Sequence, residues 1–208
     1  MGSAEASNEI AKLNLLSYLD ERPIVLCVAG PNGAGKSTFY EAFLEDAGLR
    51  YVNADDLASE LELDPYAAAE VADKLRGEFV TRGESFIFET VFSDPVGAKV
   101  EFLEEASRSG FQVVVIFIGL SAAALSELRV TMRASQGGHD VPTDKLVARY
   151  PRSLANLERA IDRLPVVLVY DNSDLRAPYT PVAQFDHGTQ VWRAKKLPRS
   201  FPRKRPLR

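Results

Sequence analysis

The sequence predicts an α/β fold of three layers built on a mostly parallel, five-stranded sheet. Apolar runs of strand type alternate along the chain with stretches whose apolar residues recur at helical spacing. A glycine-rich loop joins the first strand to the helix after it, and polar residues stand at the ends of later strands. Parallel sheets bind ligands at the carboxyl ends of their strands, so we expect the functional site at this edge.

The predicted elements follow from apolar runs and from the residues that start or stop helices. Strands rich in β-branched or aromatic residues are expected at residues 24–29, 51–53, 85–90, 111–120 and 165–170. Helices bounded by Pro, Ser, Thr or Gly are expected at 7–20, 38–47, 65–83, 94–109, 121–132 and 143–163. Pro151 predicts a kink in the last helix. Short runs at 182–185 and 190–193 predict a hairpin around Asp186, His187 and Gly188.

Length and composition indicate one globular domain, which we place at residues 1–193. The 208 residues are enough for one core and too few for two domains of ordinary size. No stretch approaches the roughly 18 uninterrupted apolar residues of a membrane span, and the first residues lack the apolar segment of a signal peptide. We therefore expect a cytoplasmic protein without a membrane partner. Cys27, the single cysteine, lies in the first strand and is expected in the core.

Charge is distributed unevenly along the chain. The segment 195–208 holds seven basic residues and no acidic one, so the other residues carry 18 basic against 29 acidic side chains. A body this acidic argues against general nucleic-acid binding. The Pro- and Arg-rich tail, residues 194–208, is predicted to be disordered, with either an anionic partner or no specific role.

The glycine-rich loop after the first strand fits the phosphate-binding pattern G-x-x-x-x-G-K-[ST]. Glycines let several backbone N–H groups face one anion, and the following helix adds the positive end of its dipole. In this pattern Lys36 reaches the β- and γ-phosphates of ATP and Ser37 holds Mg²⁺. The alternative is a plain glycine turn, but the flanking strand and helix favour a nucleotide site. The predicted nucleotide-binding residues are Gly30, Pro31, Asn32, Gly33, Ala34, Gly35, Lys36, Ser37 and Thr38.

Two acidic residues follow the second strand directly. A carboxylate here can accept the proton of a substrate hydroxyl that attacks the γ-phosphate, which makes Asp55 a candidate general base. The alternative is that Asp55 or Asp56 only caps the helix that begins there. Both can hold, with Asp56 as the cap and Asp55 at the site.

Glu89 and Thr90 end an apolar strand. Burying a carboxylate without a partner costs several kcal/mol, so we expect Glu89 to bind a substrate hydroxyl or a water on Mg²⁺. The alternative is a structural ion pair with a nearby arginine.

Two pairs of arginines flank the glycines 137 and 138. Arg129 and Arg133 are four residues apart, and Arg149 and Arg152 are three apart, so each pair shares a helix face. Two basic faces on either side of a glycine hinge describe a helical lid, at about residues 129–163, that closes over phosphates. The alternative is that these arginines are solvated or paired with acids. With two histidines and one cysteine, the chain offers little for a transition-metal site.

The ordered set GPNGAGKST, NADD, FETVFS, RVTMRASQGGHDVP, RYPRSLANL and VVLVYDNS resembles the zeta-toxin family of P-loop kinases, in the branch often labelled as predicted ABC-type ATPases. The resemblance covers about residues 22–173. It implies a P-loop kinase-like fold and an enzyme that uses ATP and Mg²⁺ to phosphorylate a sugar hydroxyl. The implied acceptor is a small molecule, a sugar nucleotide of the UDP-N-acetylglucosamine type, and the implied partner is an antitoxin.

The resemblance also implies roles for individual residues. Lys36 and Ser37 match the phosphate loop and Asp55 matches the catalytic base. Glu89 and Thr90 match the substrate-binding acid and its neighbour. The arginines that face the phosphates correspond to Arg129 and Arg133, while Arg149 and Arg152 are expected to bind the substrate.

Other functions stay open from the sequence. The acceptor can instead be a nucleoside, an antibiotic or a nucleic-acid 5′-hydroxyl, or the chain can be a regulatory protein in which ATP only orders the lid. A transporter ATPase is excluded, because the chain lacks the LSGGQ signature and no acid-ended strand follows its nearest equivalent, residues 134–138.

Overall fold

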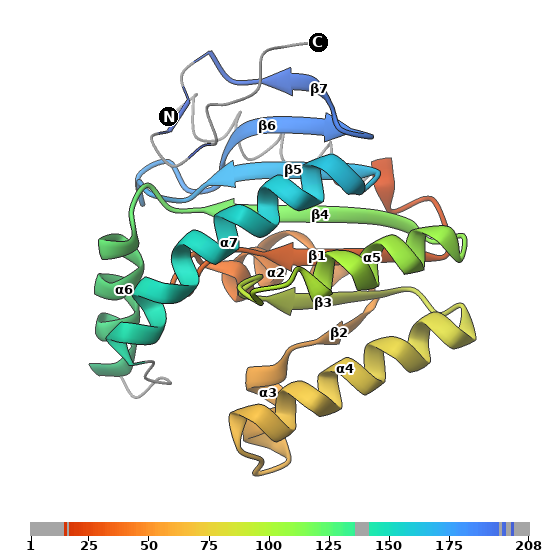
Figure 1. Ribbon diagram of the computed structural model, residues 1–208, viewed down its shortest axis with the longest axis horizontal. Coiled ribbons are helices and arrows are strands. Elements are labelled where there is room, and N and C mark those ends of the chain that lie inside the picture. Colours follow the sequence, from red (N-terminus) through yellow and green to blue (C-terminus); the bar gives the residue numbers. More distant parts are fainter. Residues whose placement is uncertain (1–14, 16, 136–141, 196, 199–200, 202–208) are drawn as a thin grey trace.

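A seven-stranded sheet forms the centre of the fold, in the order β2-β3-β1-β4-β5-β6-β7 (Figure 1). The computed structural model describes residues 15, 17–135, 142–195, 197, 198 and 201. The strands β2, β3, β1, β4 and β5 are mutually parallel and are the five that the sequence predicts. The predicted hairpin extends the sheet as two antiparallel strands beside β5. The strands are β1 (Ile24–Ala29), β2 (Arg50–Val52), β3 (Phe86–Thr90), β4 (Gln112–Gly119), β5 (Val166–Asp171), β6 (Thr180–Asp186) and β7 (Thr189–Arg193).

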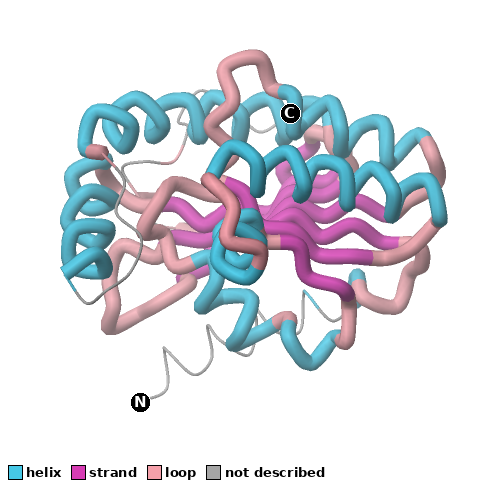
Figure 2. Tube along the Cα trace, turned by 90° about the horizontal axis from the view of Figure 1, so that it is seen from below, coloured by secondary structure: helices cyan, strands magenta, loops and turns pink. Residues whose placement is uncertain are grey.

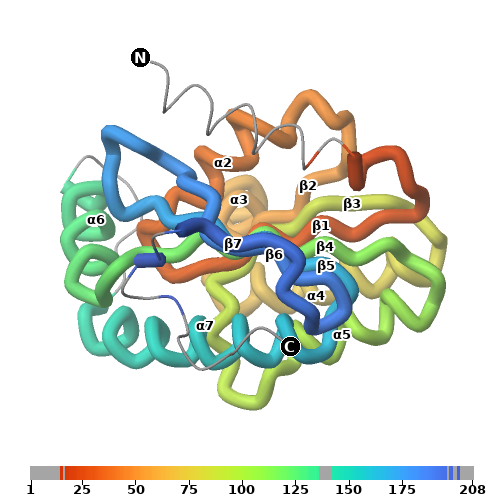
Figure 3. The backbone as a smooth tube through the Cα atoms, turned by 90° about the horizontal axis from the view of Figure 1, so that it is seen from above, coloured from red at the N-terminus to blue at the C-terminus, as the bar shows by residue number. Residues whose placement is uncertain are grey.

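Helices cover both faces of the sheet, which confirms the three-layer α/β architecture (Figure 2). Figure 3 shows α2 on one side of the strands and α4, α5 and α7 on the other. None of the helices in the described part of the chain combines the length and apolar character that a bilayer crossing requires. The helices are α2 (Lys36–Phe43), η1 (Glu45–Ala47), α3 (Ala54–Glu60), α4 (Pro65–Arg82), α5 (Ala98–Arg108), α6 (Ala123–Ser135) and α7 (Thr143–Arg163).

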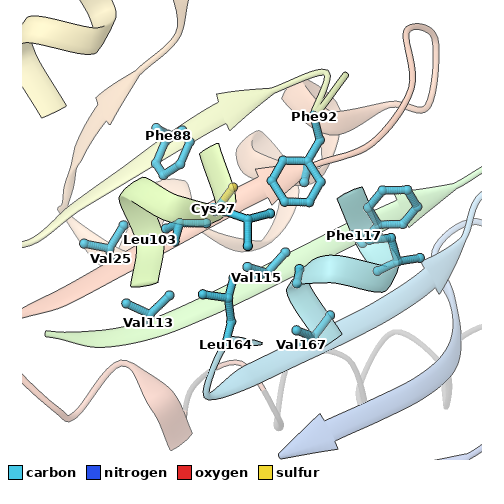
Figure 4. Close-up of a cluster of buried hydrophobic side chains, with 14 of the residues drawn as sticks. Val25, Cys27, Phe88, Phe92, Leu103, Val113, Val115, Phe117, Leu164 and Val167 are labelled. Carbon is cyan, nitrogen blue, oxygen red and sulfur yellow. The ribbon is translucent and has the colours of Figure 1, made fainter. Parts of the chain in front are cut away.

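Each central strand is buried on both faces, so its side chains alternate between two cores. In β1, Val25 and Cys27 face the core under α4, α5 and α7, whereas Leu26 and Val28 face the core under α2. Figure 4 shows the first of these cores, with Cys27 among valine, leucine and phenylalanine side chains. Cys27 is fully buried, as predicted, and burial raises the pKa of its thiol. The two-sided burial explains why these strands are continuous apolar runs.

Helix α5 begins later than the sequence predicts. The expected start was at residues 94–95, but Gly97 adopts a left-handed φ of 87° and the helix starts at Ala98. The carboxylate of Asp94 accepts the N–H of Ala98, so Asp94 closes the end of a loop rather than beginning the helix. The β3–α5 connection is therefore longer, and it leaves room beside the end of β3.

Helix α7 holds the β3–α5 loop in place. Pro151 lies inside the helix, which continues on both sides of it. Two buried polar side chains of α7 bond to loop carbonyls: Ser153 donates to Val91 O at 2.6 Å, and Asn156 donates to Phe92 O at 3.0 Å. Asn156 also donates to the carbonyl of Asp94 at 2.8 Å. The loop beyond β3 is thus fixed by the helix that the sequence assigns to the lid.

Some sequence predictions concern residues outside the described ranges. These are the hinge glycines 137 and 138, with residues 139 and 140, and most of the tail. Two described residues of the tail are not disordered: Leu197 and Phe201 pack against the core, and the Phe201 ring lies 6.4 Å from that of Phe185. Both are apolar residues in a segment whose basic, proline-rich composition predicts disorder, so their packing was not predicted.

We expect Asn156→Ala to lower the free energy of unfolding by about 2–4 kcal/mol, because it leaves two buried carbonyls without a partner. Urea denaturation measures the change. The matched control is Glu158→Ala, an exposed position on the same helix, with an expected change within about 0.5 kcal/mol. Equal changes in the two variants would contradict the pinning of the loop by α7.

Candidate functional site

The phosphate loop is shaped by glycines that no other residue can replace. Gly30 has a φ of +146°, and a Cβ placed there would lie 2.2 Å from the carbonyl oxygen of Ile118 on β4. Gly35 has a φ of +86°, and its Cβ would lie 2.7 Å from the side-chain nitrogen of Asn172. The backbone of the loop therefore packs closely against the ends of β4 and β5 before it enters α2, and only glycine fits at these two positions.

Side chains from distant elements bond to carbonyls of the loop. Asn172, after β5, donates to Ala34 O at 2.8 Å, and Ser126, on α6, donates to Asn32 O at 2.6 Å. The hydroxyl of Tyr179 donates to Gly35 O at 2.9 Å. With its carbonyls held by the protein, the loop keeps its N–H groups available for an anion.

The N-terminus of α2 differs from those of the two following helices. Asn53 caps α3 and Asp64 caps α4, each through a side-chain oxygen that accepts backbone N–H groups. Within the described residues, α2 has no side-chain cap and no acidic residue in its first turn. An uncapped helix start directly behind a glycine loop suits a bound phosphate, which supplies the missing acceptor.

Glu89, at the end of β3, is the centre of the polar network beside this loop. Its carboxylate accepts the hydroxyl of Ser37 at 2.8 Å and that of Tyr51 at 2.7 Å, and it lies 3.5 Å from the ammonium of Lys36. The side chains of Lys36 and Glu89 are only 6% and 10% exposed. A carboxylate this buried is stable because three donors surround it.

Tyr51, on β2, is part of the same network. Burial, and then the charge of Glu89, raise the pKa of Tyr51, so its hydroxyl stays protonated and donates to the carboxylate. The ring of Tyr51 stacks on that of Tyr40 with centroids 3.7 Å apart. Tyr51 therefore connects α2, β2 and β3 at the site. From the sequence, Tyr51 was predicted to be a strand residue and not a site residue.

A cavity of about 450 Å³ opens next to Glu89. Lys145 at the start of α7 donates to the hydroxyl of Tyr66 at the start of α4 at 3.4 Å, and both residues line the cavity. Asn32, in the loop, also lines the cavity, and its side-chain oxygen is a buried acceptor without a hydrogen-bond partner in the described structure. The cavity also brings together predicted site residues from four segments: Asp55, Glu89, Thr90, Arg133 and Arg149.

Asp55 lies in the cavity wall, whereas Asp56 is not among the described residues that line it. Neither carboxylate is the helix cap that the sequence analysis considered. Asn53 takes that role, and its side-chain oxygen accepts the N–H of Asp55 at 2.9 Å. Burial and the charges of Glu89 and Asp55 raise the pKa of Asp56. The cap on Asn53 sets the phase of the helix so that Asp55 faces the cavity.

Thr90 shapes the turn beyond β3. Its hydroxyl accepts the N–H of Phe92 at 3.1 Å, and Phe92 is a fully buried residue with a φ of +60°. A positive φ is uncommon for a phenylalanine, and the hydrogen bond together with burial holds it. The Thr90 side chain thus has a structural partner while it also lines the cavity.

The structure separates the four arginines of the predicted lid. Arg129 points to the phosphate loop and donates to Gly33 O and Ser173 O, both at 3.4 Å. Burial lowers the pKa of Arg129. Arg133 and Arg149 line the cavity, and Arg152 is exposed and does not line it within the described chain. Arg129 and Arg133, both expected to face the phosphates, thus lie apart: Arg129 bonds to loop and strand-end carbonyls, whereas Arg133 lines the cavity, and their contact with a nucleotide stays a prediction.

Sequence reasoning missed five charged residues that line the cavity: Asp73, Arg76, Asp94, Lys99 and Lys145. Arg76 had a detectable signal. It lies four residues after Ala72 and three before Phe79, both buried, so it falls on the apolar face of the helix. A charged residue on such a face is either paired or functional.

The residues at the loop fit ATP with Mg²⁺. The glycine positions leave no room for a side chain, the α2 start is uncapped, and Lys36 lies at the inner end of the loop. Ser37 and Glu89 offer a hydroxyl and a carboxylate, the hard oxygen ligands that Mg²⁺ prefers, either directly or through water. The two oxygens already lie 2.8 Å apart.

Comparison with solved structures shows the same fold in three chains. Chains of the AvrRxo1-ORF1:AvrRxo1-ORF2 complex match with TM-scores of 0.66 in the structure with sulphate ions and 0.65 in the structure with ATP, at 17% and 16% identity. Each match covers 90% of this chain and 66% or 65% of the other. A chain of the PezAT chromosomal toxin–antitoxin system of Streptococcus pneumoniae matches with a TM-score of 0.58 and 15% identity, covering 86% of this chain and 81% of that one.

These matches confirm the P-loop kinase-like fold that the sequence resemblance implies. No curated protein shows significant sequence similarity to the chain. The family model AAA_33, an AAA domain, matches residues 25–157, more than half of the chain. The match includes the phosphate loop, both acidic strand ends and the four lid arginines. The chain therefore belongs to the AAA_33 family of AAA domains.

Proposed function

We propose that the protein is an ATP-dependent kinase, which transfers the γ-phosphoryl group of ATP to a hydroxyl of a small molecule. One observation carries the proposal: Asn32 of the phosphate loop, Glu89 and the candidate base Asp55 line a single cavity, and Glu89 also accepts the hydroxyl of Ser37. A protein that only binds a nucleotide needs the loop but no second carboxylate facing an empty space of about 450 Å³. That space is large enough for a sugar-sized acceptor.

The donor end of the site is organised by the loop and Glu89. Bound Mg²⁺ would neutralise charge on the phosphates. Lys36 would exchange its contact with Glu89 for the phosphates, and Ser37 and Glu89 would hold the metal or its waters. Because these groups are already buried and oriented, little reorganisation is needed when the donor binds.

Asp55 acts as the general base at the acceptor end. It lies in the cavity wall on the first turn of α3, where it can accept the proton of the acceptor hydroxyl as the oxygen attacks phosphorus. The bond to the bridging oxygen breaks in the same reaction, and ADP leaves. Arg133 and Arg149 line the cavity from α6 and α7 and stabilise the charge on the transferred group. Arg129 supports the loop from behind.

The lid is part of the proposal. The predicted lid, at about residues 129–163, includes the end of α6 and all of α7, which carry the cavity arginines, and Lys145 already contacts Tyr66 across the cavity. Closure of these helices over the acceptor would bring Arg133 and Arg149 to the phosphates and exclude water.

For the acceptor we propose a sugar nucleotide of the UDP-N-acetylglucosamine type, and for the partner an antitoxin. The support is the resemblance to the zeta-toxin kinases together with the matched chain of a toxin–antitoxin system. The chain spans about two thirds of the AvrRxo1 complex chains that it matches. Kinases for a nucleoside, an antibiotic or a nucleic-acid 5′-hydroxyl are the competing proposals, and a regulatory ATP-binding protein is the non-catalytic one.

The acceptor is tested by ATP consumption with and without UDP-N-acetylglucosamine, followed by mass spectrometry of the sugar nucleotide. We expect acceptor-dependent formation of ADP and one added phosphate on the sugar. Labelling of a nucleoside, an antibiotic or an RNA 5′-end in its place would overturn the acceptor, and ATP binding without transfer to any of them would overturn the kinase.

The general base is tested by a matched pair of neighbours. We expect Asp55→Asn to lower kcat by about 10²–10⁴-fold while ATP affinity stays within about twofold. Asp56→Asn, which removes the adjacent carboxylate outside the cavity wall, is expected to keep kcat within about threefold. Steady-state kinetics and ATP titration measure both. Full turnover in Asp55→Asn would rule out its role as base.

A further inference from the structure

A second charged cluster lies in the cavity, on the side covered by α4 and α5. We call it the basic cluster: Arg76, Lys99 and the aspartate between them, Asp73. The Arg76 guanidinium lies 4.8 Å from the centroid of the Phe88 ring. Phe88 precedes Thr90 by two residues on the same face of β3, so Arg76 lies beside the strand before its carboxyl end. Glu89 faces the opposite side, toward Ser37.

The basic cluster contains two cationic side chains, and both form ion pairs with the same aspartate. One carboxylate oxygen of Asp73 pairs with both Arg76 and Lys99. The charge of the nearby Asp94 also acts on Lys99, but the carboxylate of Asp94 accepts its hydrogen bonds from the N–H of Ala98 and the side-chain amide of Asn156. The Arg76 guanidinium has five N–H donors in a planar fork, and a single carboxylate oxygen cannot satisfy them.

Burial makes both cations costly in the ligand-free cavity. The Arg76 side chain is only 5% exposed and that of Lys99 24% exposed, yet both line the cavity. Burial, and then the charge of Arg76, lower the pKa of Lys99 to about 8. Burial likewise lowers the pKa of Arg76 to about 10. A ligand anion would stabilise both charges, whereas a neutral ligand would leave them as they are.

We propose that the basic cluster binds a carboxylate or phosphate group of the acceptor, so that the site selects anionic acceptors. Arginine and lysine donors converge on one side of the cavity, which suits the paired oxygens of such a group. The inference rests on the proposed function, because that function places the reacting hydroxyl near Asp55 and Glu89.

The test measures binding, so it does not need turnover. Isothermal titration is performed on the full chain saturated with Mg·ADP, which blocks the phosphate loop. The probes are N-acetylglucosamine, its 1-phosphate and glucuronate, which are neutral, phosphorylated and carboxylated. We expect an anionic probe to bind at least about tenfold more tightly than the neutral sugar.

Variants assign the effect to the cluster. Lys99→Met is expected to lower the affinity for the anionic probe at least about tenfold and the affinity for the neutral sugar less than about twofold. Lys99→Arg restores the charge and the affinity. Lys74→Met is the matched control, an exposed lysine on α4 that does not line the cavity in the described structure. Arg76→Lys is the second cluster variant, with thermal unfolding recorded for each protein.

The pH dependence gives an independent readout. Lys99 is faced by Arg76, Asp73, Asp94 and the buried thiol of Cys27. Because its pKa is about 8 in the free protein, the wild type should lose affinity for the anion as pH rises from 7 to 9. The affinity of Lys99→Met for the anion should not change over this pH range. Lys99→Arg should still bind the anion tightly at pH 9.

The outcomes separate this inference from the proposed function. Equal binding of neutral and anionic probes, or no effect of Lys99→Met, overturns the anion subsite even if the protein phosphorylates an acceptor. Failure of both anions to bind overturns it as well. Tight anion binding that depends on Lys99, in a protein that transfers no phosphate, supports the subsite and contradicts the kinase.

Discussion

The structure depends on one buried carboxylate, Glu89, and on the donors that stabilise it. Its oxygens accept the hydroxyls of Ser37 and Tyr51 and face the ammonium of Lys36, and these groups come from α2, β2 and the phosphate loop. Burying a carboxylate costs several kcal/mol unless donors surround it. The network therefore forms only if α2, β2 and β3 are aligned so that the donors reach Glu89. The parallel pairing of β3 with both β1 and β2 supplies that alignment, because it places the strand ends side by side.

A second constraint acts from the opposite face of the sheet. Ser153 and Asn156 on α7 hold the loop after β3, and Thr90 fixes its first turn around the buried Phe92. The helix that carries Arg149 is thereby connected to the loop that borders the acceptor cavity. These hydrogen bonds connect α7 to the loop at the cavity, so a movement of α7 in the proposed lid would change the shape of the acceptor cavity.

Features carried by local chemistry could be predicted from the sequence, and features carried by long-range contacts could not. The phosphate loop was predictable because only glycine fits at Gly30 and Gly35, and the five parallel strands because two-sided burial demands apolar runs. The choice of Asp55 over Asp56 as the cavity residue was a matter of helix phase, which the cap on Asn53 settles. The spacing of Arg129 and Arg133 predicted a shared helix face, but it could not indicate that the carbonyls of two distant segments accept hydrogen bonds from Arg129. Tyr51 was missed because its partner lies 38 residues away.

The central claim is that Glu89 couples Mg²⁺ to the nucleotide. The most direct measurement is the affinity for a non-hydrolysable ATP analogue, with and without Mg²⁺, in the wild type and in Glu89→Gln. We predict that Glu89→Gln binds the metal-free analogue more tightly than the wild type does, since one negative charge is removed. The gain in affinity that Mg²⁺ gives should then be smaller in the variant than in the wild type, by a factor of about 5–150. An unchanged gain from Mg²⁺ in Glu89→Gln would contradict the account.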